Sequence, residues 1–164
     1  MNKYLLSFMV MTAVIFSACA HQKKTVKSKV MTESRIQQIA MDRTPCFGTC
    51  PAYRVTVNKD GKVIFKSWAY TTYEGTYEKQ FPAEKVAALF KQFSQYRVDT
   101  CSPEYNSLLQ DVPGVSYTIT YPDSEKTITN AHFGPQFLKT LSFETDSFSK
   151  VDDSWTKTAE AEKR

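Results

Sequence analysis

The chain has 164 residues, 41% of them hydrophobic and 23% charged, with a formal net charge of +4. This length suits one domain around one hydrophobic core. Five lysines and no acidic residue fall within residues 1–31, which leaves 16 basic and 17 acidic residues for the rest of the chain. The folded part is therefore close to neutral, so the positive total does not indicate nucleic-acid binding, and no nucleic-acid partner is expected.

The first residues have the pattern of an export signal. Lys3 precedes an apolar run, Tyr4 to Ala18, which is shorter than the roughly 20 apolar residues that cross a membrane. The run leads into Phe16-Ser17-Ala18-Cys19, which resembles the lipobox of bacterial lipoproteins, where the cysteine is lipidated and becomes the mature N-terminus. We therefore expect residues 1–18 to be a signal peptide and Cys19 to carry acyl chains that hold the protein on a membrane.

Residues 19–31 include four lysines and have no apolar periodicity. This pattern is typical of a flexible tether, and its lysines are expected to lie near anionic headgroups. Ala20 is not acidic, so the chain lacks the inner-membrane retention signal of the enterobacterial rule. We expect a lipid-anchored protein of the bacterial cell envelope, at the outer membrane and facing the periplasm. Residues 32–152 are predicted to form one domain, and residues 153–164 a polar tail that frays.

The first half of the domain has the alternation of β-strands. The clearest case is Tyr53, Val55 and Val57, which share one face of an extended segment. Asp60-Gly61 suits the tight turn of a hairpin, and Gly75 breaks the strand that returns from it. The expected strands are residues 38–43, 52–57, 63–70 and 76–81. A short helix over residues 34–40 is the alternative for the first of them.

The second half combines helical and alternating patterns. Pro82 opens a helix whose apolar stripe has the spacing i, i+3, i+4 and i+7; the stripe is Val86, Leu89, Phe90 and Phe93. Strands follow over 115–121 and 126–130, and Pro135 opens a last helix. The pattern predicts an α+β fold, with a mostly antiparallel sheet of about five strands, the order β-β-β-α-β-β-α, and two helices packed on one face. The other face should be wet and rich in Thr, Lys, Arg and Tyr.

Three cysteines follow the leader: Cys46, Cys50 and Cys101. Exported domains sit in an oxidising compartment, where neighbouring thiols usually form disulfides. Gly48 permits the sharp turn that a Cys46–Cys50 ring requires, and we favour that pairing. Spacing does not fix connectivity, so Cys101 is either a free thiol or the partner of one of the other two.

Cys46-x-x-x-Cys50-Pro51 also resembles the motif of thioredoxin-like copper chaperones of the cell envelope, in which two thiolates and a distant histidine hold the ion. Thiolates select Cu(I), and His132 would supply the imidazole. In that family the second cysteine leads into a helix, whereas Pro51 here leads into a predicted strand, so copper or thiol-redox chemistry is the alternative rather than the main prediction. A zinc site from both cysteines, Cys101 and His132 has suitable ligand types, but nothing in the spacing brings them together.

Catalytic groups are few. His21 lies in the tether, and His132 lies in a segment that reads as a loop or helix entry. The chain has no phosphate-binding loop, nucleophile elbow or zincin helix. A hydrolase that uses His132 with a nearby carboxylate is therefore the weakest hypothesis, and no cofactor is expected.

Four aromatic residues cluster between residues 68 and 77: Trp68, Tyr70, Tyr73 and Tyr77. Aromatic residues on a sheet usually pack across strands. If several of them faced solvent, they would form a flat platform suited to a glycan or a peptide. They are the candidate binding surface, with an envelope protein or a glycan as the partner.

Residues 43–65, RTPCFGTCPAYRVTVNKDGKVIF, resemble the start of a bacterial family of exported domains of unknown function. The family pattern is a basic residue and Thr, then Cys-Phe-Gly-x-Cys-Pro-x-Tyr, a strand, an Asp-Gly turn and a second strand. The similarity extends from about Ile39 to Phe148. It implies an α+β fold, a recurrent Cys46/Cys50 pair and frequent lipid anchoring, and it carries over no catalytic residue. The favoured interpretation is a non-catalytic, lipid-anchored domain that binds a partner or assists envelope assembly.

Overall fold

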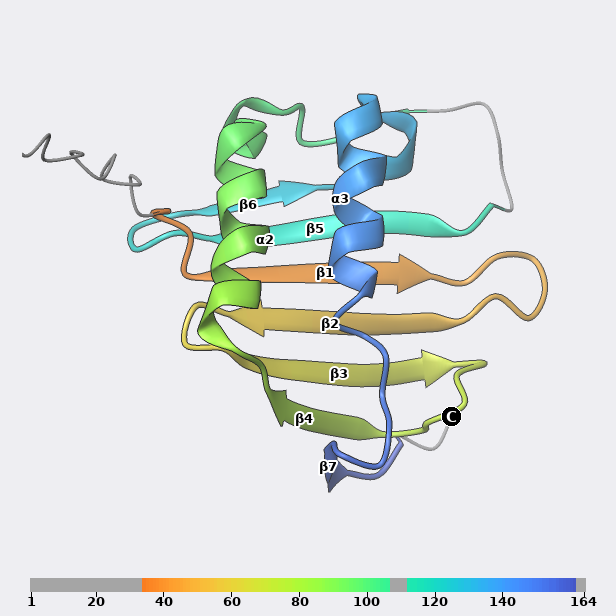
Figure 1. Cartoon of the computed structure of the whole chain (residues 1–164). Coiled ribbons are helices and arrows are strands. Elements are labelled where there is room, and N and C mark those ends of the chain that lie inside the picture. Colours follow the sequence, from red (N-terminus) through yellow and green to blue (C-terminus); the bar gives the residue numbers. More distant parts are fainter. Residues whose placement is uncertain (1–33, 107–111, 162–164) are drawn as a thin grey trace, which may run out of the picture. The chain divides into compact units, whose positions relative to one another are not determined.

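The computed structural model of the chain describes residues 34–106 and 112–161, which contain a seven-stranded sheet and two helices packed on one of its faces (Figure 1). The strands are β1 (Gln38–Thr44), β2 (Ala52–Asn58), β3 (Lys62–Ala69), β4 (Thr76–Gln80), β5 (Gly114–Thr120), β6 (Glu125–Ile128) and β7 (Thr156–Ala159). Their order across the sheet is β6-β5-β1-β2-β3-β4-β7, and every neighbouring pair is antiparallel. The predicted α+β class and mostly antiparallel sheet are confirmed, but the sheet has seven strands rather than about five.

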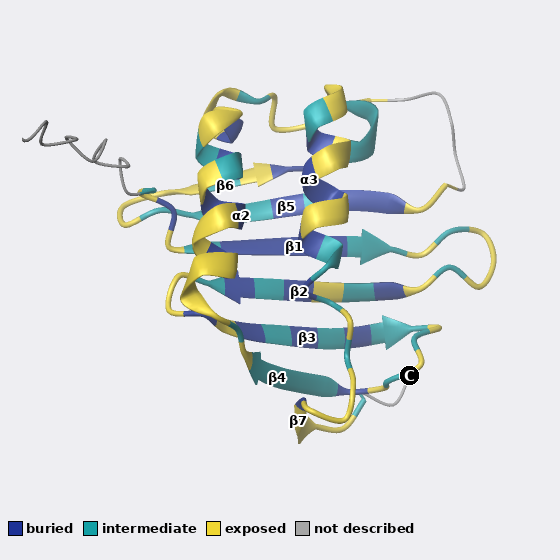
Figure 2. Cartoon of the chain, in the orientation of Figure 1, coloured by how far each residue is buried: buried dark blue, intermediate teal, exposed yellow. Residues whose placement is uncertain are grey.

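The helices are α2 (Ala83–Gln95) and α3 (Gln136–Asp146), with short 3₁₀ turns η1 (Val98–Thr100) and η2 (Ala131–Phe133) before β5 and α3. Both helices lie on the same face and cross the strands (Figure 1). The predicted apolar stripe of α2 is its buried side, and exposed residues line the outer sides of both helices (Figure 2). The described residues include no helix that has the length and apolar character needed to span a membrane.

The core lies between the sheet and the helices. Met41 and Val55 from the central strands are fully buried, as is Phe93 from α2. Tyr117 on β5 is also fully buried; its ring meets that of Phe93 edge-on, with 5.4 Å between centroids, and its hydroxyl donates to the carbonyl of Leu138 in α3 at 3.0 Å. A phenol can be buried here because its one polar group finds an acceptor.

β1 is an interior strand of the sheet and lies between β5 and β2. The strand interpretation of residues 38–43 is therefore correct, and the helix alternative over 34–40 is wrong. Gly61 closes the predicted β2–β3 hairpin with φ of 93°, and its N–H donates to the carbonyl of Asn58 at 3.0 Å. A side chain at this position would also collide with the carbonyl of Phe81, so two constraints favour glycine.

The C-terminal segment corrects the expectation of a frayed tail. Residues 156–159 form β7, which pairs with β4 at the edge of the sheet. Trp155 is buried just before it, 5.8 Å from the ring of Phe81, and its Nε1 donates to the carbonyl of Lys150 at 3.1 Å. One large aromatic side chain thus fixes a segment that is otherwise exposed.

The sheet face opposite the helices carries polar residues, as expected, but not the strand tyrosines. Asp42 and Arg54 form a two-point ion pair there, with distances of 2.6 and 2.7 Å. Tyr53 and Tyr117 instead lie on the helix side, where their hydroxyls meet α3. Burying the rings next to polar partners is favoured over leaving both rings in solvent.

Candidate binding site beside the disulfide loop

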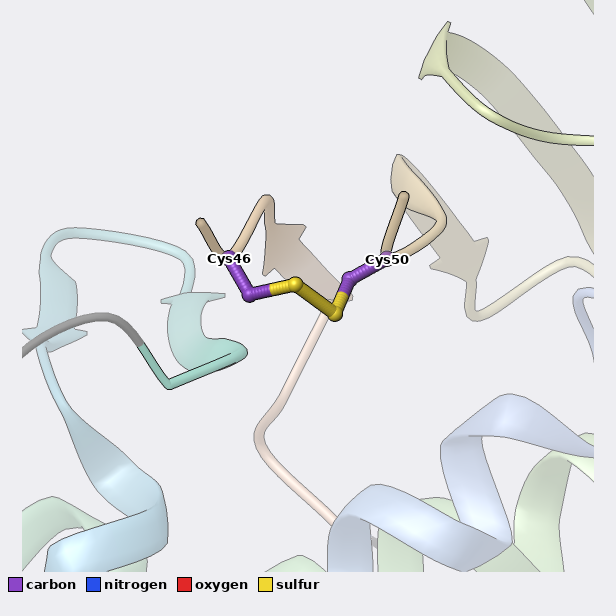
Figure 3. Close-up of a disulfide and its surroundings, with 2 residues drawn as sticks. All are labelled: Cys46 and Cys50. Atoms are coloured by element: carbon purple, nitrogen blue, oxygen red, sulfur yellow. A yellow bond between two sulfur atoms is a disulfide. The ribbon is translucent and has the colours of Figure 1, made fainter. Parts of the chain in front are cut away.

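The loop that joins β1 to β2, residues 45–51, is closed by a Cys46–Cys50 disulfide, which confirms the favoured pairing (Figure 3). The two Cα atoms are 5.6 Å apart. Inside the ring, the N–H of Gly48 donates to the carbonyl of Cys46 at 2.8 Å. Cys101 is a free, half-buried thiol. We refer to residues 45–51 as the disulfide loop.

Phe47 lies at the tip of the disulfide loop and is 90% exposed. It is the central residue of the three-residue turn closed by Gly48. A ring this small leaves the side chain little room to fold back onto the domain. The sequence contained this signal, a large apolar residue between two neighbouring cysteines, but Phe47 was not among the predicted site residues.

A groove of about 300 Å³ opens beside the disulfide loop, on the helix side of the sheet. We call it the tyrosine groove, and its lining includes Pro51, Tyr53, Tyr70, Thr72, Tyr73 and Ser149. Pro51 comes from the disulfide loop, the residues numbered 70–73 come from the β3–β4 connection, and Ser149 follows α3. Three segments distant in sequence therefore meet at one end of the sheet. Among the described residues that line the groove, Lys150 is the only one with a formal charge.

Tyr70 combines exposure with an unfavourable backbone. Its φ is 54°, in the left-handed region, and 59% of its surface is exposed. This region costs a non-glycine residue about 1 kcal/mol or more. Beside it, the hydroxyls of Ser67 and Thr71 lie 2.6 Å apart, and Thr71 also donates to the carbonyl of Tyr73 at 2.9 Å. These hydrogen bonds give the β3–β4 connection a defined shape, in which Tyr70 lines the groove.

Tyr53 links the groove to a polar network at the base of α3. Its hydroxyl donates to Asp146 Oδ1 at 2.6 Å and accepts from Ser149 Oγ at 3.4 Å. Burial and the hydrogen bond to the Asp146 carboxylate raise the pKa of Tyr53 to about 12. The phenol therefore stays protonated at neutral pH and serves as a fixed donor.

Arg43 on β1 completes the network by an ion pair with Asp146. Burial lowers the pKa of Arg43, but the hydrogen bond and the charge of Asp146 outweigh it, so the pKa is raised. The guanidinium also reaches Ser142 Oγ at 3.4 Å. The network connects β1, β2 and α3 by hydrogen bonds and an ion pair. It therefore positions the segment after α3, which lines the groove.

The four predicted surface aromatics do not form one platform. Trp68 lies on the sheet face opposite the helices, where the guanidinium carbon of Arg54 is 5.8 Å from its ring centroid. Tyr73 meets Tyr77 edge-on at 5.8 Å on the helix side, and Tyr77 is half-buried behind it. Of the four, only Tyr70 and Tyr73 line the groove. The alternation of β3 separates Trp68 from them, because successive side chains point to opposite faces.

The copper and zinc hypotheses required several ligands to converge. Within residues 34–106 and 112–161, which include both bonded cysteines, Cys101 and His132, no three His, Cys, Asp or Glu side chains are grouped so as to hold an ion. Cys50 is followed by β2 rather than by a helix, so it lacks the arrangement that lowers thiol pKa values in thioredoxin-like proteins. The proposed ligand sets are not assembled.

His132 lies in η2, and its Nδ1 accepts a hydrogen bond from the N–H of Val115 at 3.1 Å. Its Nε2 is buried and has no hydrogen-bond partner among the described residues. Burial lowers the pKa of the imidazole. The side chain therefore supports the start of β5, and the hydrolase hypothesis finds no carboxylate hydrogen-bonded to it in the described part of the chain.

Comparison with known protein families assigns this domain to one of them. A family model described as "Domain of unknown function (DUF6438)" matches residues 37–149. The chain belongs to this family. The DUF6438 match contains the disulfide loop, the β3–β4 connection and Ser149, and it ends before β7. No curated protein matched the chain, and no solved structure matched it.

Proposed function

We propose that this DUF6438 protein is a lipid-anchored protein of the bacterial cell envelope that acts by binding a protein partner, without catalysis, at the tyrosine groove. The observation that carries the proposal is Tyr70, whose ring is exposed at the groove although its backbone is unfavourable for tyrosine. Strained backbone persists where the surrounding structure imposes it, and such residues cluster at functional sites.

The chemistry of the groove suits a protein surface. Tyr53, Tyr70 and Tyr73 offer apolar ring area together with hydroxyl groups, and tyrosine is enriched at protein interfaces for that reason. Tyrosines also order at low entropic cost, since each has two rotatable side-chain bonds. Because Lys150 is the only charged residue among the described lining residues, recognition would depend on shape and hydrogen bonds rather than on charge.

The anchoring part of the proposal rests on the sequence around Cys19, which lies outside the described residues. β1 is the first strand of the described residues, and the groove lies beside the loop that follows this strand. The described residues that precede β1 join it at its other end, away from the loop beside the groove, which supports a groove that is accessible in a tethered protein.

Photo-cross-linking in living cells tests the groove. A benzoylphenylalanine residue at exposed Thr72, in the full chain, should give a discrete covalent adduct on irradiation. The matched control carries the same group at Phe143, which is 62% exposed on α3 but does not line the groove. An adduct of the same size and yield from both positions, or none from Thr72, would refute a specific site. A glycan adduct would refute a protein partner.

A further inference from the structure

Phe47 is the most exposed large apolar side chain in the described residues. The disulfide and the Gly48 hydrogen bond constrain its backbone at the tip of the loop. An anchor on a backbone that is already constrained loses less conformational freedom on binding than one on a flexible loop, which favours affinity. Large aromatic anchors of this kind commonly carry much of the binding energy at protein interfaces when they fill a pocket.

The same loop supplies a wall of the tyrosine groove. Pro51 lines the groove, and Phe47 lies four positions earlier in the same disulfide loop. An aromatic projection and an aromatic-lined hollow therefore lie at the same end of the same sheet. A surface that contains both halves of a contact is self-complementary, and two copies related by a two-fold axis can make the contact twice.

We infer that the groove takes a second copy of this chain, with Phe47 of each copy inserted in the tyrosine groove of the other. This inference rests on the proposed function, because it names the protein that occupies the groove. A two-fold arrangement closes on itself, so it gives a dimer and not a filament.

The charge distribution favours this occupant. Residues 44–52 contain no charged side chain, and Lys150 is the only charged residue among the described residues of the groove. Two copies would therefore meet with little like-charge repulsion or charge desolvation at the centre of the interface. Tethering both copies to one membrane would raise their effective concentration, so modest affinity would suffice.

The test uses the full chain purified from membranes in detergent, labelled in separate batches with a fluorescence donor or acceptor at the C-terminus. Energy transfer should rise with protein concentration at constant excess of micelles. Phe47→Ala should weaken this association at least about tenfold. Phe143→Ala should leave it unchanged, since that side chain is similarly large and exposed but lies away from the groove.

A mixing experiment separates exchange of Phe47 from a non-specific effect. Tyr70→Asn damages the groove but keeps Phe47, whereas Phe47→Ala keeps the groove. Each variant alone would lose both contacts of the dimer. An equal mixture would retain one intact contact in each mixed dimer, so donor-labelled Phe47→Ala should associate with acceptor-labelled Tyr70→Asn more tightly than either variant associates with itself.

The outcomes separate the inference from the proposed function. No concentration-dependent transfer in the wild type, equal effects of the Phe47 and Phe143 substitutions, or no gain on mixing would each overturn dimerisation. A Thr72 adduct with a different protein would overturn it too, yet would support the groove as a binding site. An adduct of twice the chain mass, absent in Phe47→Ala, would support both.

Discussion

Tyr70 has a backbone conformation that asparagine and glycine adopt more readily than tyrosine. We predict that Tyr70→Asn leaves the free energy of unfolding unchanged or raises it by up to about 1 kcal/mol, because relief of backbone strain offsets the lost ring contacts. Urea denaturation of the full chain measures this quantity. Tyr70→Val removes the same ring, but valine adopts the left-handed region poorly, so this variant should lower the free energy of unfolding. Equal losses for the two variants would show that Tyr70 is mainly a packing residue.

Tyr53 gives a prediction at alkaline pH. Its pKa in the folded protein is about 12, above the ordinary value of 10, so the unfolded chain loses this proton first as the pH rises. The stability that this difference contributes is complete below pH 10 and is lost between pH 10 and about 12. In Tyr53→Phe, the slope of unfolding free energy against pH in this range should become shallower. It should not vanish, because burial also raises the pKa of Tyr117. An unchanged slope would contradict the account.

At the scale of elements, the disulfide loop should matter more for presenting Phe47 than for stability. A ring of this size removes little entropy from the unfolded chain, so replacing Cys46 and Cys50 together by serine should cost about 2 kcal/mol at most. The loss of self-association should be larger than the loss of stability, because the disulfide would no longer constrain the backbone at Phe47. Cys101→Ser is the matched control, since that thiol is free, and it should leave self-association unchanged. If the double variant associated as tightly as the wild type, the disulfide would not be needed for self-association.

Elements defined by local pattern could be predicted from the sequence. The β2–β3 hairpin has its alternation and its Asp60-Gly61 turn within a few residues, and the stripe of α2 has helical spacing. β7 could not be predicted, because its four residues are all exposed and it is held by pairing with β4 and by burial of Trp155. Contacts between distant segments decide such a strand, and they leave little trace in its own sequence.

The site shows the same division. The Cys46–Cys50 pair is local, and the sequence favoured it. The groove is not local: the hydroxyl of Tyr53 meets Asp146, 93 residues away, and Ser149 joins them from the segment after α3. The sequence shows a concentration of aromatic rings between residues 68 and 77, but the pleat of β3 places Trp68 on the other face of the sheet. Only the folded structure shows which tyrosines line the groove together.

At the scale of the whole molecule, the proposed function combines a lipid anchor with a binding domain. Metabolic labelling with an alkyne fatty acid should modify the wild-type chain and not Cys19→Ser, because the acyl chains need the Cys19 side chain and the amino group exposed by cleavage. The Cys19→Ser protein should also leave the membrane fraction, since multiple acyl chains supply most of the membrane affinity. Equal labelling of the two proteins would contradict anchoring at Cys19.

The most direct test of the central claim, that the tyrosine groove is a binding site, is the yield of the Thr72 photo-adduct with and without Tyr70→Asn in the same chain. The two proteins should be equally stable and equally abundant in the membrane. We predict that Tyr70→Asn reduces the adduct at least about tenfold, as expected for an aromatic residue at the centre of an interface. An adduct of undiminished yield would show that the groove does not bind the partner through Tyr70 and would contradict the account.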